Sequence, residues 1–412
     1  MPEPGNAAAG TYAGIATHKD FHVVAVIDHL GRLLDTHTAK TTDEGYRQLL
    51  QWLSPFTPII RVGVEGTGSY GVAVTATLGK HGFDVVEVNR PSRQMRRFRG
   101  KNDTVDAESA ARSVLSQSSS AIPKSHDGLI ESIRLLRISL TSLRKCRTTL
   151  TNSLRNVIVG APPRMREHLE AMTSTALVAH CARLRVSPGA PSDPVQALKS
   201  TLRALATHIL AQTAELNGLR THLTELTRAA NPALLAAPGV GVDSASALLI
   251  TAGDNPERLR SEAAFAALCG VSPIEASSGK HVRHRLNRGG DRQANSALWR
   301  IAMIRSNSDE RTRVYTARRT AEGKSPREIS RCLKRHIARE VYSLLTAPPP
   351  IAGTDDLRPL RHRTGLAMQA AADHFEVSLT TVSRTERGIK PNHEFAARYR
   401  TWLIEHEPVS AV

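Results

Sequence analysis

The order of apolar runs in the first third of the chain restricts its fold more than any other sequence feature. Runs of strand length occur at 13–19, 23–27, 59–64 and 85–88. Segments with helical spacing occur at 42–53, 72–81 and 103–117. A Thr-Thr-Asp sequence at 41–43 is a typical helix start, and 28–31 is a predicted hairpin turn. The alternation predicts an α/β domain over residues 12–122, with the element order of a ribonuclease-H-like domain.

Acidic residues lie at the ends of these predicted elements. Glu65 follows one strand, and Asp103 and Asp106 are three residues apart in a helix, so that one helical face presents both. Carboxylates at strand ends and on the next helix suit Mg²⁺, which prefers oxygen ligands and binds phosphodiesters with few protein carboxylates. The aspartate pair alone is also compatible with a solvated helix start. Glu65 and the nearby cations favour a metal–phosphate site; these cations are Arg93, Arg96, Arg97, Arg99 and Lys101.

The corresponding place in the first strand lacks a carboxylate. Ala16 stands there, in the sequence Gly14-Ile15-Ala16-Thr17-His18-Lys19. A fourth acid at this position would help to compensate the charge of a bound Mg²⁺. The absence of that acid bears directly on whether the chain can catalyse a reaction.

Residues 123–232 have a different pattern. Leucine and isoleucine recur at helical spacing from 129 to 150 and again from 198 to 226. This pattern predicts two long helices that fold back on each other as a coiled-coil hairpin. Proline-rich sequences at 161–163 and 188–194 are the predicted turn region.

Residues 233–346 are predicted to form a helical domain. The sequence at 237–245 is similar to a helix-hairpin-helix, in which glycines allow the backbone to approach a phosphate. Ser277 and Ser278 precede Gly279 in a loop beside several cations, a setting in which a serine can become a nucleophile, although a polar turn also explains it. Between Lys280 and Leu345 there are 17 Lys and Arg residues against 6 Asp and Glu residues. This concentration favours phosphate binding over a merely solvated face.

The C-terminal part is predicted to be a separate helical module. Residues 347–362, which begin with Ala-Pro-Pro-Pro, form a predicted linker. In 363–412, a helix at 369–375, a tight turn and a second helix at 379–387 match a helix-turn-helix of the phage-repressor type. Thr381 and Arg384 would face DNA from the second helix, although a merely stabilising helical cap is the alternative.

The composition restricts the partners of the chain. Among 412 residues, 55 Lys and Arg against 38 Asp and Glu give a net charge of +17, which favours a polyanion. No stretch approaches the ~20 apolar residues of a membrane span, and residues 1–10 do not resemble a signal peptide. The four cysteines form no C-x-x-C pair and suit a reducing compartment. A cytoplasmic, nucleoid-associated nucleic-acid-binding protein is therefore expected.

Two other motifs suggest different chemistry. Residues 66–71 match G-x-G-x-x-G after a strand, as in dinucleotide-binding enzymes, but the two preceding strands and the basic, helical remainder argue against that fold. His281 and His284 have the spacing of metal ligands, but no third ligand is near in sequence. The dinucleotide enzyme therefore remains a less favoured alternative.

Taken together, these segments resemble the serine-dependent DEDD transposases of the insertion-sequence "one-ten" group, the bridge-RNA-guided recombinases. The resemblance covers about residues 12–346. Its motifs are G-I-D-x-x-K, E-x-T-G-x-Y, K-x-D-x-x-D-A, P-G-I/V-G, and G-L/V-T/S-P followed by S-G. They correspond here to residues 14–19, 65–70, 101–107, 238–241 and 270–279.

The resemblance implies a function and a set of site residues. The four acids of the family fall on Ala16, Glu65, Asp103 and Asp106, and its nucleophilic serine falls on Ser278. It implies Mg²⁺ as the cofactor, donor and target DNA and a guide RNA as partners, and a dimer to tetramer. We expect DNA or RNA contacts from ten residues: Arg96, Arg97, Arg99, Lys101, Lys280, Arg283, Arg285, Arg288, Thr381 and Arg384.

The expected function is therefore RNA-guided, site-specific DNA recombination through a phosphoserine intermediate. Ala16 departs from the family pattern at the first acid, which predicts impaired catalysis. A non-catalytic nucleic-acid-binding regulator is the alternative that Ala16 leaves open.

Overall fold

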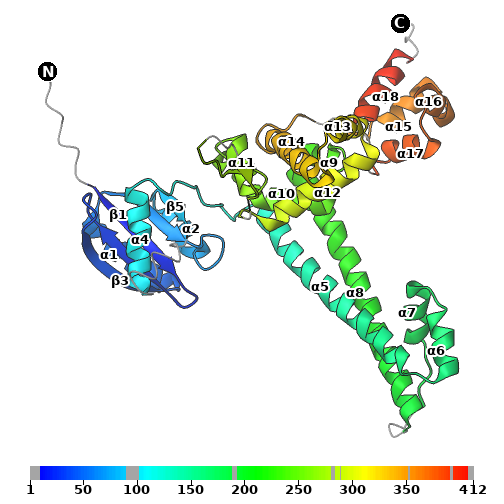
Figure 1. Cartoon of the computed structure of the whole chain (residues 1–412), viewed down its shortest axis with the longest axis horizontal. Helices are drawn as coiled ribbons and strands as arrows, with labels where there is room; N and C mark the ends of the chain where they lie inside the picture. Colours follow the sequence, from blue (N-terminus) through cyan, green and yellow to red (C-terminus); the bar gives the residue numbers. More distant parts are fainter. Residues whose placement is uncertain are drawn as a thin grey trace. The chain divides into compact units, whose positions relative to one another are not determined.

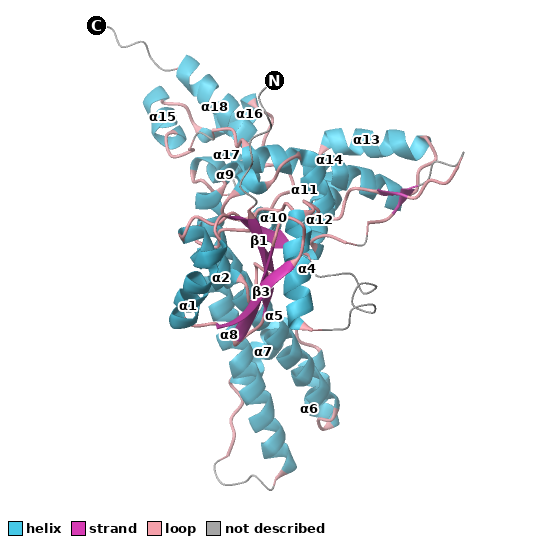
Figure 2. Cartoon of the chain, turned by 90° about the vertical axis from the view of Figure 1, so that its left-hand side faces the viewer, coloured by secondary structure: helices cyan, strands magenta, loops and turns pink. Residues whose placement is uncertain are grey.

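The structure is a computed structural model that describes residues 10–89, 102–187, 193–279, 284–287, 289–350, 353–389 and 393–406. The chain divides into two compact units. The first contains Met1–Gly128 and Ala252–Arg260, and the second contains Leu129–Thr251 and Ser261–Val412. The predicted mixture of an α/β region and a mainly helical region is confirmed, because all described strands except two short ones lie in the first unit (Figure 2).

The first unit is built on a five-stranded sheet. Its strands are β1 (Thr11–Thr17), β2 (Phe21–Ile27), β3 (Leu33–Lys40), β4 (Ile59–Glu65) and β5 (Val85–Val88). The order across the sheet is β3-β2-β1-β4-β5. The first three strands are antiparallel neighbours, whereas β4 runs parallel to both β1 and β5. The carboxyl ends of β1 and β4 therefore meet at the same edge.

Helices cover both faces of this sheet. On one face, α1 (Asp43–Leu53) and α2 (Val72–Lys80) supply Tyr46, Leu49, Leu53, Val74 and Leu78 to a core that includes Ala13, Ile15, Val62 and Val64. The short 3₁₀ helix Ser54–Phe56 follows α1. On the other face, α4 (Asp103–Leu115) lies across the strands (Figure 1). Strand alternation separates the two sets of side chains, so the residues before and after Ile15 point toward α4.

A segment distant in sequence completes the first unit. Ala252–Arg260, which includes the 3₁₀ helix Pro256–Arg258, packs against the segment that follows α4. The Arg258 Nε donates to the Ile122 carbonyl at 2.8 Å, and the Arg258 guanidinium lies 3.7 Å from Glu87 on β5. The Asn255 Nδ2 donates to the Pro123 carbonyl at 2.9 Å. These contacts attach to the α/β unit a segment that was predicted to belong to the domain at 233–346.

Two long helices dominate the second unit. α5 (Leu129–Val159) and α8 (Pro194–Ala230) lie side by side, as the leucine spacing predicts (Figure 1). The proline-rich region at 161–163 is not a simple turn, because α6 (Pro163–Glu170) and α7 (Ser174–Ala182) lie between the long helices. Both short helices contribute to an apolar core with α5 and α8, through residues such as Leu169 and Cys181. Most of 188–194 lies outside the described residues.

The next segment is a group of helices with one hairpin. The helices are α9 (Pro232–Ala236), α10 (Val242–Ala252), α11 (Glu262–Leu268), α12 (Arg292–Ser308), α13 (Glu310–Ala321) and α14 (Pro326–Thr346). The hairpin pairs β6 (Ile274–Glu275) with β7 (His284–Arg285). Arg305 of α12 is buried and joins three elements, because it donates to the Pro238 carbonyl at 2.7 Å and pairs with both carboxylate oxygens of Glu340.

The described residues of the C-terminal module form four helices: α15 (Leu357–Thr364), α16 (Met368–His374), α17 (Leu379–Glu386) and α18 (His393–Glu405). The predicted linker at 347–362 therefore contains most of a helix, and Leu357 and Leu360 of that helix are part of the module's core. Arg361 and Glu386 form a buried ion pair at 2.7 Å, and the Tyr399 hydroxyl donates to the same carboxylate at 2.8 Å. Within the described ranges, no helix has the length and apolarity that crossing a membrane requires.

Candidate functional site

The acidic edge comprises positions 16, 65, 103 and 106. Ile15 and Val64 are partners in the parallel pairing of β1 and β4, so Ala16 and Glu65 follow at neighbouring strand ends. Both lie one residue beyond side chains of the α1–α2 core and therefore point to the α4 side of the sheet. The two strand-end positions of the predicted set are thus on the same face.

Helix α4 brings the other two acids to this face. Asp103 and Asp106 are in its first turn, and Asn102 caps the helix by accepting from the Thr104 amide at 3.1 Å. The close approach of α4 depends on Gly14, because a Cβ there would be 2.2 Å from the Ala107 carbonyl oxygen and from the Ala111 nitrogen. Contact between the helix backbone and β1 therefore fixes where the two aspartates lie.

His18 is an additional member of the acidic edge that the sequence did not indicate. Its Nε2 lies 3.1 Å from the Asp103 Oδ1, with both side chains partly exposed. The neighbouring His22 is fully buried and its Nε2 lies 3.2 Å from the Tyr46 hydroxyl. Burial and then the charge of His18 lower the pKa of His22 from 6.5 to about 4. His22 is therefore neutral and buried next to His18, whose imidazole in turn contacts the Asp103 carboxylate.

The residues present do not fit the Mg²⁺ site that the resemblance implies. Ala16 is only 2% exposed and packs with Val23, Ala25 and Ala107 in an apolar cluster. This surface offers no oxygen ligand where the family has its first carboxylate. In the part of the chain that the structure describes, no three His, Cys, Asp or Glu residues are grouped closely enough to hold a metal ion. The expected cations of this region, Arg93, Arg96, Arg97, Arg99 and Lys101, lie outside the described residues.

The glycine-rich turn after β4 is closed by hydrogen bonds between its own backbone groups. The amides of Ser69 and Gly71 both donate to the Gly66 carbonyl, at 2.9 and 3.1 Å. A dinucleotide-binding turn would instead offer such amides to a pyrophosphate. Together with the antiparallel β2 and β3, this turn leaves the dinucleotide alternative without support.

The serine hairpin is the segment between Gly270 and Gly290. Ser278 and Gly279 are exposed, after β6 and before β7. Arg285 is the second residue of β7, pairs with Ile274 across the hairpin and is exposed. The other cations expected here, Lys280, Arg283 and Arg288, lie outside the described residues, as does His281. The hairpin thus presents a serine hydroxyl to solvent with Arg285 on a neighbouring strand.

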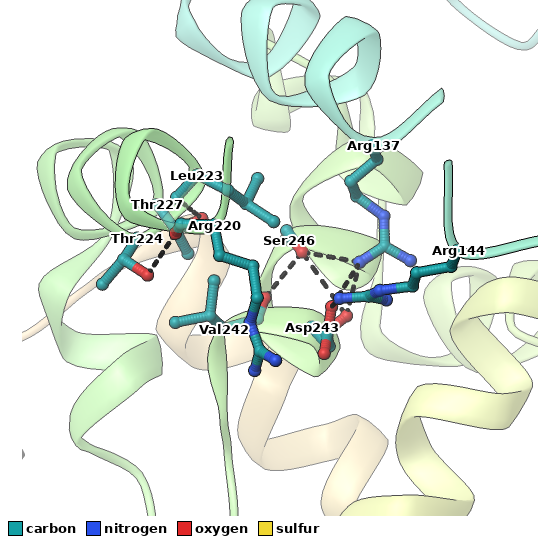
Figure 3. A network of polar contacts seen from close by, with 9 residues as sticks. All are labelled: Arg137, Arg144, Arg220, Leu223, Thr224, Thr227, Val242, Asp243 and Ser246. Carbon is teal, nitrogen blue, oxygen red and sulfur yellow. Dashed lines mark hydrogen bonds and ion pairs between the residues drawn. The ribbon is translucent and has the colours of Figure 1, made fainter. Parts of the chain in front are cut away.

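Side chains of α5 contact one side of the predicted helix-hairpin-helix. Arg137 of α5 donates to the Asp243 carbonyl and to the Ser246 hydroxyl, both at 2.7 Å, and Arg144 lies 3.3 Å from the Asp243 Oδ1 (Figure 3). Gly239 has a φ of +71°, and a Cβ there would be 3.1 Å from the Arg305 side chain. This glycine therefore permits close packing on α12, and phosphate binding at the loop stays a prediction.

In the C-terminal module, α16 and α17 are connected by a turn in which Glu376 has a φ of +53°. Thr381 is partly exposed and its hydroxyl lies 2.9 Å from that of Ser378, at the start of α17. Arg384 is exposed on the same helix. The buried Arg361–Glu386 pair connects α17 to α15 and fixes the helix that carries Arg384.

Comparisons with known proteins identify the family. A transposase model of the DEDD IS110 type matches residues 13–163. A model described as "Transposase IS116/IS110/IS902 family" matches residues 231–317. Together they cover more than half of the chain and include both the acidic edge and the serine hairpin. The chain belongs to the IS110 transposase family.

A curated relative supports this assignment over a shorter segment. It is the "Insertion element IS110 uncharacterized 43.6 kDa protein" of Streptomyces coelicolor, 31% identical over 152 residues. The match covers 37% of this chain and 36% of the relative, so it spans about a third of that protein's length. The C-terminal module lies outside both family-model matches.

Several contacts of this family member were not predicted from its sequence. His18 beside Asp103 and Asn255 beside Pro123 depend on how the chain folds, and neither has a local signature. Asn295 of α12 donates to the Cys269 carbonyl, just before the serine hairpin, and accepts from Lys334 of α14, which is far away in the sequence. A stronger signal was available for Gly290, because the Gly-Gly-Asp sequence at 289–291 precedes a helix start.

Proposed function

We propose that this protein is a DNA recombinase of an insertion element and that its acidic edge is incomplete. The observation that carries the proposal is the pair of family matches, one over the acidic edge and one over the serine hairpin. The family name implies DNA as the substrate. The exposed Ser278 then provides the hydroxyl for the cleavage step, as the resemblance implies.

The proposed reaction is a transfer of the phosphodiester to serine and back. The Ser278 Oγ forms a bond to phosphorus while one bridging P–O bond of the DNA breaks, and the serine proton ends on the leaving oxygen. The reverse reaction with another DNA end releases the serine. Because the phosphoserine keeps the phosphodiester linkage, rejoining needs no external energy source. We expect Arg285, which is exposed on the strand paired with β6, to neutralise phosphate charge.

The gap at Ala16 limits this activity in the chain as it stands. Glu65, Asp103 and Asp106 remain on the α4 side of the sheet, but the fourth position presents a methyl group in an apolar cluster. We infer that DNA cleavage by this chain is slow and that Ala16→Asp raises the rate in the presence of Mg²⁺.

The decisive experiment measures nicking and covalent adduct formation on cognate donor and target DNA. Four proteins are compared: the chain as given, Ala16→Asp, Ala16→Asp with Ser278→Ala, and Ala16→Asp with Ser277→Ala as the matched control. We expect a denaturant-resistant protein–DNA adduct with Ala16→Asp and its Ser277→Ala form only. An adduct that persists without Ser278 refutes the serine assignment, and full activity of the chain as given refutes the role of Ala16.

The proposal includes a guide RNA and assembly of a dimer to tetramer. The net charge of +17 and the 4% aromatic content suit backbone and shape contacts to folded RNA more than base stacking. Purified protein is expected to contain a discrete non-coding RNA, and specific recombination by RNA-free protein refutes the guide-RNA proposal.

The ribonuclease-H-like, RuvC-like interpretation of the first unit is also part of the proposal. The two antiparallel hairpins followed by parallel strands are consistent with it.

We further propose that the C-terminal module is a helix-turn-helix that binds a DNA site and keeps the protein at the nucleoid. The exposed Arg384 on α17, in a module whose core is separate, supports this proposal. Deletion of 352–412 is expected to weaken binding to that site and to leave guided cleavage intact. Arg384→Ala should weaken the module's preference for its cognate DNA sequence by roughly 1–3 kcal/mol. The control is Arg358→Ala, which removes an exposed arginine from α15 and should leave this preference unchanged.

A non-catalytic nucleic-acid-binding regulator is the second candidate. The specific observation in its favour is Asp103 paired with His18 beside a fully apolar position 16. The experiment above separates the two candidates. If Ala16→Asp binds guided DNA but forms neither nicks nor adducts, the regulator is the better description.

A further inference from the structure

The serine hairpin leaves and rejoins the helices at a contact between two glycines. Gly270 has a φ of +65° and Gly290 a φ of +83°. A Cβ on Gly270 would be 2.6 Å from the Gly289 carbonyl oxygen, and a Cβ on Gly290 would be 2.6 Å from the Gly270 nitrogen. The Asp291 amide donates to the Leu268 carbonyl at 2.6 Å beside this contact. The two ends of the hairpin are therefore in backbone contact.

The Asn295 side chain contacts the start of the serine hairpin, which we call the base of the hairpin together with Gly290. The Asn295 Nδ2 donates to the Cys269 carbonyl at 2.9 Å and to the Gly270 carbonyl at 3.1 Å. Cys269 is the C-cap of α11 and Gly270 is the next residue, where the hairpin begins. A side-chain amide that bridges two consecutive carbonyls fixes the direction in which the chain leaves the helix.

A second side chain orients the first. The Lys334 Nζ on α14 donates to the Asn295 Oδ1 at 3.1 Å. This bond determines which end of the amide is the acceptor, so that the NH₂ group points at the two carbonyls. Burial, followed by the charge of Arg331, lowers the pKa of Lys334. The hydrogen bond to the Asn295 Oδ1 offsets part of this cost of burying the ammonium group.

We propose that Asn295 and Lys334 are positioning residues for Ser278. They act through the backbone at Cys269 and Gly270 and set the direction of the serine hairpin without touching the DNA. This inference rests on the proposed function, because it assumes that Ser278 is the reacting group. It adds to that function a connection from α14 through α12 to the start of the hairpin.

A merely structural role makes a different prediction. If the two residues only join α12 to α14, their loss lowers the stability of the whole helical group and affects hairpin and helices alike. If they direct the hairpin, their loss selectively increases motion between Gly270 and Gly290. Local opening can be measured separately from global unfolding by amide hydrogen exchange.

The test uses full-length protein carrying Ala16→Asp. Asn295→Leu removes the amide at similar volume, Lys334→Met removes the ammonium, and Lys334→Arg keeps a cationic donor. Asn217→Leu, at an exposed position on α8, is the matched control for the asparagine substitution. For each variant we measure the melting temperature, hydrogen exchange in 271–279 and in α12 and α14, DNA affinity, and the rate of adduct formation on bound DNA.

Asn295→Leu and Lys334→Met are expected to accelerate exchange in the hairpin and to slow adduct formation by about tenfold or more, because a small displacement of a reacting group costs rate. DNA affinity and exchange in α12 and α14 should stay at the parent values. Lys334→Arg should recover most of the adduct rate. Asn217→Leu should match the parent in every measurement.

The outcomes separate this inference from the function on which it rests. If the Ala16→Asp parent forms no adduct, the recombinase proposal fails, and hairpin exchange still decides whether Asn295 and Lys334 hold the base. If the parent forms an adduct and both variants form it at the same rate, the positioning role is wrong while the function stands. If Asn295→Leu does not fold, the comparison of Lys334→Met with Lys334→Arg decides the matter.

Discussion

The acidic edge and the serine hairpin are held in place by different kinds of contact. At the acidic edge, small residues allow α4 to approach the sheet, and the positions depend on packing around Gly14 and Ala16. At the hairpin, two glycines and a polar connection through Asn295 hold the two ends of the segment together. An edge fixed by packing can lose a carboxylate and keep its shape, because alanine fits an apolar cluster. A hairpin fixed at its base depends on a few polar atoms for its direction.

The largest effect that tests this comparison is expected at Gly14. Gly14→Ala places a methyl group 2.2 Å from backbone atoms of α4, so the helix must move away from β1. We expect a loss of about 3 kcal/mol or more in the stability of the first unit. Chemical denaturation, followed by hydrogen exchange of β1 amides, measures it. Gly79→Ala in α2, with open space around it, should instead stabilise by about 0.5–1 kcal/mol.

The second effect concerns the charge at position 16. Without divalent cations, Ala16→Asp buries a carboxylate among apolar side chains and on the same face as the three other acids of the edge, which should cost about 2–4 kcal/mol. Mg²⁺ should recover part of this loss by binding the folded state. Ala16→Asn has the same shape without the charge and should not respond to Mg²⁺. Equal responses of the two variants in melting experiments would contradict an acidic edge that depends on this position.

The third effect is a pH dependence of the first unit. The pKa of His22 is about 4 in the folded protein and 6.5 when the side chain is solvated in the unfolded chain, so between these values the unfolded chain binds the extra proton. Stability should therefore be complete above pH 6.5 and decrease by about 2–3 kcal/mol as the pH falls toward 4. His22→Leu should flatten this part of the stability curve. A curve for His22→Leu with the parent's slope between pH 6.5 and 4 would show that other groups cause the dependence.

The elements that the sequence predicted well are those that local pattern determines. Apolar runs and the Thr42 cap located β2, β4, β5 and α1 to within a few residues. Pro163 was interpreted as part of a turn, but it is the first residue of α6, where a missing amide has no cost. The membership of 252–260 in the first unit was not predictable, because Arg258 and Asn255 find their partners more than 100 residues away.

The candidate site shows the same division. The face shared by Ala16, Glu65, Asp103 and Asp106 follows from strand alternation and helical spacing, which can be read from sequence. The contact of His18 with Asp103 cannot be read in this way, because it depends on how closely α4 approaches β1. Spacing likewise does not indicate that Asn295 bridges two carbonyls, since any exposed helix can carry an asparagine.

The smallest expected effect tests the hairpin beside the serine itself. Gly279 has a φ of +56° with open space around its Cα, so an alanine there causes strain without a clash. Gly279→Ala should cost about 1 kcal/mol locally and leave the melting temperature of the helices unchanged. In the Ala16→Asp background it should slow adduct formation, because the backbone next to Ser278 changes direction. Gly279→Asn should slow it less, since asparagine adopts positive φ more readily. If both variants form the adduct at the parent rate, the local backbone at Gly279 does not position the serine, and control of the hairpin lies at its base alone.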